Sequence, residues 1–95
     1  MNTQLIHIGF GNILAINRAV AVISPGSAPI KRLVQEGKAK GLIIDMTSGR
    51  KTKTVIVMDS GHLVLAALTP ETIAGRVVSG RGGQAVKPSG EEDNV

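Results

Sequence analysis

Short apolar segments rich in β-branched residues, divided by glycines, limit what this chain can fold into. They lie at about residues 4–8, 19–23, 42–46, 52–58 and 63–68. Segments of this length between turn residues are typical of buried strands rather than of helices. The segment Ile13–Ile16 fits either a short strand or one helical turn. The chain is therefore expected to build a small sheet.

Two further segments carry helix signals. Ser27 is a suitable N-cap and Pro29 lies in the first turn, which predicts a central helix over about 28–40. A threonine cap, Thr69, predicts a C-terminal helix over about 70–79 in the same way. The order of strands and helices indicates an α+β domain with a small, mostly antiparallel sheet.

The length of the chain favours self-association. Residues 1–78 form the predicted domain, and the glycine-rich segment 79–95 has the composition of a flexible, disordered tail. A core of that size supplies only about 3–5 kcal/mol, and the chain has no cysteine for a disulfide. Helices would cover one face of the sheet, and we expect a neighbouring copy to cover the other. This predicts a homo-oligomer.

Neither catalysis nor a membrane location is indicated. No apolar stretch approaches the ~18 residues of a membrane span, and the N-terminus lacks the features of a signal peptide, so a cytoplasmic protein is expected. The histidines, His7 and His62, have no accompanying metal-ligand spacing. Asp45 and Asp59 could face each other across one hairpin, but a turn residue and a lysine partner are simpler explanations. We predict no enzyme, no metal and no cofactor.

Positive charge is the main functional signal. The predicted domain carries nine Lys and Arg against four Asp and Glu, which suggests a polyanionic partner. Arg50, Lys51 and Lys53 cluster between two apolar segments, at the tip of a predicted hairpin. The hydroxyls of Thr52 and Thr54 could donate to phosphate oxygens there. On composition alone, a nucleic-acid contact and a solvated charged loop both remain open.

Other cations, and the scarcity of aromatic residues, narrow the class of partner. Arg18 lies at a strand junction, and Lys31 and Arg32 lie at the start of the central helix. Proteins that bind single strands stack bases on aromatic side chains, whereas this chain has only Phe10. A duplex held by its phosphates needs no such platform.

A glycine-rich turn interrupts the first apolar region. Gly9, Phe10, Gly11 and Asn12 superficially resemble the start of a phosphate loop, but the full fingerprints are absent. A strand bend that needs glycine torsion angles is the simpler interpretation. We assign Gly9, Phe10 and Gly11 a structural or assembly role.

Five blocks of sequence resemble the RemA-like family of bacterial regulators of the extracellular matrix. They are Ile6–Asn12, Asn17–Arg18, Ser24–Arg32, Leu42–Arg50 and Val55–Ser60, and they occur in the order found in that family. The likeness covers residues 5–78. It implies a double-stranded DNA-binding regulator that activates biofilm matrix operons. It also implies a ring-shaped homo-oligomer whose basic rim engages DNA, without a helix-turn-helix.

The resemblance also implies roles for single residues. Family arginines implicated in DNA contact correspond to Arg18, Arg50 and Lys51, and Pro29 matches a family proline expected to support assembly or helix placement. The family usually carries arginine where this chain has Lys51 and Lys53. Lysine keeps the charge but lacks the planar fork that reads guanine or grips phosphate at two points.

Two alternatives come from other functional classes. A nucleoid-associated structural protein would bind DNA through the same cations, but without operator preference. An anion-binding or small-molecule module would instead combine residues 9–12 with Arg18 as a phosphate pocket. DNA competition would separate the first alternative from a regulator, and ligand-induced thermal shifts would identify the second.

Overall fold

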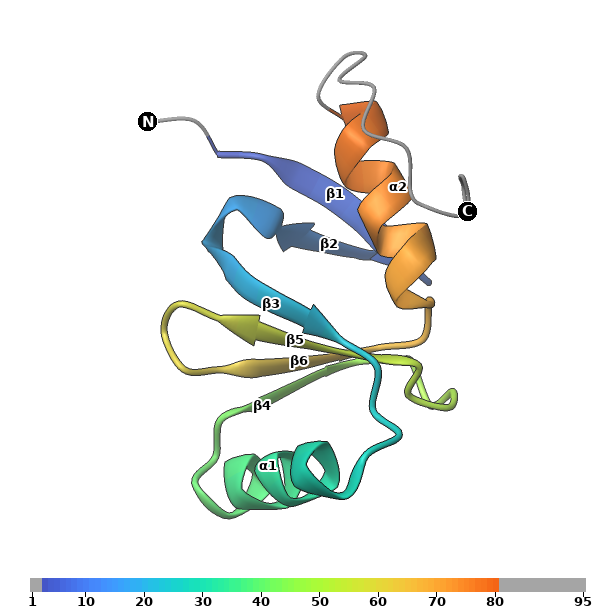
Figure 1. Ribbon diagram of the computed structural model, residues 1–95. Helices are drawn as coiled ribbons and strands as arrows, with labels where there is room; N and C mark the ends of the chain where they lie inside the picture. Colours follow the sequence, from blue (N-terminus) through green and yellow to red (C-terminus); the bar gives the residue numbers. More distant parts are fainter. Residues whose placement is uncertain (1–2, 81–95) are drawn as a thin grey trace.

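The computed structural model describes residues 3–80 of the chain (Figure 1). In chain order the elements are β1 (Leu5–Gly9), β2 (Asn12–Ala15), the 3-10 helix η1 (Ile16–Arg18), β3 (Ala19–Ile23), α1 (Ala28–Ala39), β4 (Ile43–Met46), β5 (Thr54–Met58), β6 (Leu63–Ala66) and α2 (Pro70–Gly80). The α+β class and both helices are confirmed. The ambiguous segment after residue 12 is a strand followed by a 3-10 turn. The predicted tail lies outside the described residues, except that α2 extends to Gly80.

The strands form two sheets rather than the single one predicted. β1 and β2 make an antiparallel hairpin, and the other four strands are ordered β3-β5-β6-β4. The β3–β5 and β5–β6 pairs are antiparallel, but β4 and β6 are parallel. All four residues of β6 are buried. A continuous apolar run of this kind is typical of a strand covered on both faces.

The predicted hairpin between β4 and β5 was wrong, because β6 lies between these two strands. The segment 47–53 is a crossover connection that passes the end of β6, where the Lys53 amide donates to the Ala66 carbonyl at 2.8 Å. A local pattern could not show this, because the partner of β4 follows it by about twenty residues and only after β5.

Each face of the four-stranded sheet is covered by the chain itself. Figure 1 shows the β1–β2 hairpin and α2 on one side of this sheet and α1 on the other. The first layer buries Ile6, Ile8, Leu14, Ile56, Val64, Ala66 and Ile73. The second buries Val55, Leu63 and Leu65, with Ile30, Val34, Ile43 and Val57 packed against them. The expectation that a neighbouring copy must cover one face was therefore wrong.

The termini of α1 follow the sequence signals. Ser27 Oγ accepts a hydrogen bond from the Ile30 amide at 3.4 Å, and Gly41 has a φ of +72° just after the helix. Gly37 is the buried residue of α1. A hydrogen stands there in place of a side chain, so the helix can approach Leu63 and Ile43 closely.

β3 was predicted to be buried, but it is an edge strand of its sheet. Within residues 3–80 it pairs only with β5, and Val20 on this strand is 69% exposed. A groove of about 300 Å³ runs between β3 and α2 and is lined mainly by apolar side chains, including Val20, Val22 and Val77. Across the described residues, neither helix is long and apolar enough to cross a bilayer.

Candidate functional site

The connection between β4 and β5, residues 47–53, is called the Arg50 loop. It begins with a carboxylate turn: Asp45 Oδ1 accepts bonds from the Thr47 amide at 2.9 Å and from the Thr47 hydroxyl at 2.6 Å. The hydroxyl bond is the main reason that the pKa of Asp45 lies below its ordinary value. Ser48 and Gly49 then adopt positive φ angles, and the Arg50 amide donates to the Thr47 carbonyl at 3.0 Å. The loop is therefore held in one shape before any partner arrives.

The turn between β1 and β2 supports the Arg50 side chain. Its guanidinium carbon lies 3.7 Å from the centroid of the Phe10 ring, a cation–π contact. Asn12 fixes the turn in place, because its side-chain amide donates to the Gly9 carbonyl at 3.0 Å and to the Met46 carbonyl at 2.9 Å. Phe10 thus holds a cation from a loop forty residues away.

Sequence reasoning did not identify this contact. It assigned Gly9, Phe10 and Gly11 a structural or assembly role, and all three adopt positive φ angles in the tight turn. Phe10 does so despite its side chain, which is uncommon outside glycine. A lone aromatic residue between two glycines was a visible signal, but nothing in the sequence marks Arg50 as its partner. An assembly role for the three residues stays a prediction.

The other cations of the Arg50 loop are exposed, but one predicted donor is not available. Lys51 and Lys53 are both exposed to solvent. Thr54 is fully buried, and its hydroxyl donates to the Leu68 carbonyl at 2.6 Å. It therefore cannot serve as a phosphate donor as predicted. Thr52 is half-buried and lines a cavity beside α1.

Arg18 lies at the opposite end of the sheet. It directly precedes β3, whose first residue pairs with Met58, whereas the Arg50 loop leads into the start of β5. The five residues of β5 span about 17 Å at 3.4 Å per residue. One chain therefore does not bring Arg18 and Arg50 into a single site. The alternative phosphate pocket of Arg18 and residues 9–12 is excluded, because that turn lies at the Arg50 end, bonded to Met46.

Arg18 already has an acidic partner. Its Nε donates to Asp59 Oδ2 at 2.7 Å, and the Asp59 amide donates to the Arg18 carbonyl at 2.8 Å. The side-chain hydrogen bond to Arg18 lowers the pKa of Asp59 below its ordinary value. The two side chains are 59% and 47% exposed, so solvent screens the pair. An incoming phosphate would have to replace the carboxylate.

The cations of α1 lie on the side of the Arg50 loop. Lys31 and Lys51 line the same cavity from opposite walls. Arg32 and Pro29 are exposed on the first turns of α1, and Arg32 does not line that cavity. Arg50, Lys51, Lys53 and Lys31 thus lie at one end of the sheet, and a shared role for Arg32 stays a prediction.

The other titratable candidates have local roles. Asp45 and Asp59 lie at different ends of the sheet and bond to Thr47 and Arg18, so the possible pairing of the two carboxylates does not occur. His62 Nδ1 lies 2.7 Å from Ser60 Oγ within the exposed β5–β6 turn. In the portion of the chain that the structure describes, no three His, Asp or Glu residues are grouped to hold a metal ion.

Known proteins similar to this chain are named as regulatory proteins. Residues 5–77 match the family described as RemA-like, extracellular matrix regulatory protein A-like. Regulatory proteins from Dehalococcoides mccartyi, in strains BAV1 and 195, are 62% identical over 95 residues, which is 100% of this chain and 98% of theirs. A regulatory protein of Thermoanaerobacter sp. is 50% identical over 93 residues, covering 98% of this chain and 95% of its own length. By sequence, over residues 5–77, this chain belongs to the RemA-like family.

Proposed function

We propose that this protein is a double-stranded DNA-binding transcriptional regulator that engages the phosphate backbone through the Arg50 end of its sheet. The observation that carries the proposal is the fixed, exposed presentation of Arg50 on Phe10, with Lys51 and Lys53 beside it. A preorganised cation loses less conformational entropy on binding than a free one. Within residues 3–77, no acidic side chain forms an ion pair with any of these three cations.

A duplex fits this end of the sheet better than a single strand does. Phe10, the one aromatic residue of the chain, already has Arg50 against its ring. It is therefore not a free platform on which a base could stack. Clustered cations without stacking residues suit a phosphate backbone, which dominates the affinity of duplex binding.

A homo-oligomer would resolve the separation of Arg18 from Arg50. One chain offers few phosphate contacts, and a ring of copies would repeat them around a rim and raise the effective concentration of each contact. In such a ring, Arg18 of one copy could serve the same duplex as the Arg50 loop of another. The unpaired edge of β3, with exposed Val20 and the apolar groove beside it, is a suitable surface for a second copy.

The family description supports a target among extracellular matrix genes, and a regulator of this kind would act at the nucleoid. A second candidate function is a nucleoid-associated protein without operator preference. Lys51 and Lys53 favour it, because lysine binds phosphate as a point charge and lacks the bidentate fork used to read guanine. Competition between a matrix-gene promoter and unrelated DNA of equal length separates the two.

The test is binding of a fluorescent duplex, measured by anisotropy over a series of salt concentrations. The logarithm of the affinity should fall by about 0.9 per phosphate neutralised for each unit of log salt. Arg50→Ala should weaken binding about tenfold and reduce the slope by about 0.9, with the sedimentation profile unchanged. Lys40→Ala, which removes an exposed charge beyond the C-terminal end of α1, is the matched control. A shallow slope for the wild type, or equal losses in both variants, would refute the proposal.

A further inference from the structure

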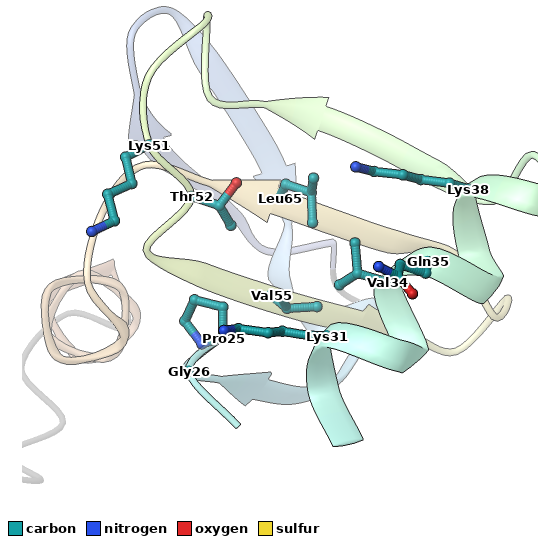
Figure 2. Close-up of a pocket in the computed structure, with 10 residues that line it drawn as sticks. All are labelled: Pro25, Gly26, Lys31, Val34, Gln35, Lys38, Lys51, Thr52, Val55 and Leu65. Carbon is teal, nitrogen blue, oxygen red and sulfur yellow. The ribbon is translucent and has the colours of Figure 1, made fainter. Parts of the chain in front are cut away.

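A cavity of about 510 Å³ lies between α1, the segment after β3 and the Arg50 loop (Figure 2). We call it the α1 cavity. Its volume falls within the ~300–1,000 Å³ range of small-molecule sites. DNA is too wide to enter a hollow of this size, so the proposed DNA contacts do not account for it.

The floor of the α1 cavity is aliphatic. Val55 and Leu65 rise from neighbouring strands of the sheet, and Val34 faces them from α1 (Figure 2). Val55 and Leu65 belong to the buried core, so the floor is rigid and cannot collapse to fill the space. It suits the apolar body of a ligand.

The rim of the cavity is cationic. Lys31 and Lys38 extend from α1 toward the side of the Arg50 loop, where Lys51 flanks the opening (Figure 2). Among the residues that the structure describes, no Asp or Glu lines the cavity. Lys38 contributes only a minor part to the lowered pKa of Asp45, whose carboxylate is bonded to Thr47. Three lysines match the two or more charges of a phosphate ester better than the single charge of a carboxylate.

Two neutral polar groups add donors and acceptors. Gln35 extends from α1 beside Val34, and Thr52 lies on the opposite wall (Figure 2). An amide and a hydroxyl beside an aliphatic floor can orient the heteroatoms of a ligand. The combination fits a molecule with a charged end and a body that carries few polar atoms.

We propose that the α1 cavity binds an organic phosphate of nucleotide size, with the phosphate at the lysine rim and the body on the aliphatic floor. Lys51 belongs both to this rim and to the proposed DNA contacts. An occupied cavity would therefore weaken DNA binding, and DNA would weaken ligand binding by the same factor. This regulatory consequence rests on the proposed function, whereas ligand binding itself does not.

The experiment is calorimetric titration of the full chain with ATP, octyl phosphate and inorganic phosphate. ATP and octyl phosphate distinguish a nucleoside from an alkyl body, and at least one of them should bind more than tenfold tighter than inorganic phosphate. Lys38→Gln should weaken that binding about fivefold. Lys40→Gln, a lysine of α1 outside the cavity lining, should leave it unchanged. Lys38 is not among the proposed DNA contacts, so Lys38→Gln should keep wild-type DNA affinity.

Several outcomes would overturn the inference. The first is the absence of any heat of binding for both organic phosphates. The second is an affinity for inorganic phosphate equal to that for the organic phosphates. The third is an equal loss of affinity in Lys38→Gln and Lys40→Gln. Saturating ligand should also lower the affinity for a duplex at least threefold, and an unchanged affinity would refute the coupling through Lys51. If the ligand binds but the duplex does not, the proposed DNA function fails alone. If the duplex binds but neither organic phosphate does, the cavity proposal fails alone.

Discussion

Replacing Gly37 with alanine sets two opposing effects against each other in α1. Alanine is favoured over glycine in a helix interior by about 1 kcal/mol. At position 37, however, an added Cβ would lie 2.9 Å from Leu63 Cδ1 and 3.1 Å from Ile43 Cδ1. Leu63 is buried in the core on that face of the sheet, so its side chain has little space to move away.

The relative sizes of these two effects decide whether Gly37→Ala stabilises or destabilises the protein. Overpacking a core by one methyl group costs about 1–3 kcal/mol, which equals or exceeds the gain in helix propensity. We expect Gly37→Ala to lower the free energy of unfolding by about 0–2 kcal/mol. Gly75 in α2 is the matched control, because a Cβ there would meet nothing within 4 Å. Gly75→Ala should raise the free energy of unfolding by about 1 kcal/mol.

Urea unfolding followed by far-ultraviolet circular dichroism measures both variants. Protein concentration must be the same throughout, because any self-association would contribute to apparent stability. The two variants should differ by about 1–3 kcal/mol, which isolates the overpacking cost. Equal stabilisation by the two substitutions would show that α1 does not approach Leu63 as closely as described, and the α1 cavity would then lose its shape.

Two further predictions concern the cations. Phe10→Leu removes the cation–π contact with Arg50 and should weaken duplex binding about two- to fivefold, with an unchanged salt slope because the charge remains; a slope reduced by about 0.9, as for Arg50→Ala, would contradict this. Asp59→Asn removes the carboxylate that pairs with Arg18 and should strengthen duplex binding, whereas equal or weaker binding would exclude Arg18 from the interface. Because the pKa of Asp59 is lowered from about 3.8, the stability supplied by this pair is complete above that pH and is lost as the pH falls through the folded-state pKa. The stability of the wild type should therefore fall more steeply than that of Asp59→Asn in that acid range, and the difference between the two proteins should disappear at lower pH.

Local signals predicted the elements well because each depends on neighbouring residues. The serine cap and the glycine stop bound α1 as expected, and Pro70 begins α2. Pairing between strands was predicted less well. Adjacent strands separated by a glycine turn usually form a hairpin. Here, however, β6 lies beside β4 and pairs with it in parallel, at the position where a hairpin would have put β5. The prediction that β3 is buried was wrong for the same reason, because the pairing of the strands, and not the composition of β3, puts it at the edge of the sheet.

For the candidate site too, the sequence predicted the individual residues but not the contacts between them. Its cations were visible in the sequence, since Lys51, Lys53 and Arg50 cannot be buried without partners. The sequence did not show how these residues are grouped. Arg18 lies at the far end of the sheet and is paired with Asp59. Phe10, from a turn distant in the sequence, contacts Arg50. Contacts between segments forty residues apart leave no periodic trace in either segment.

The placement of β6 between β4 and β5 has a consequence for the order of folding. Both neighbours precede β6 in the chain, so the spacing between β4 and β5 is not set until β6 has been synthesised and inserted. The Arg50 loop joins those two neighbours, and its two ends therefore acquire their fixed separation only at that stage. A nascent or truncated chain that ends before Ala66 would carry every cation of the loop without displaying them as a surface. Such a fragment should show weak, unspecific attraction to DNA until the sheet closes.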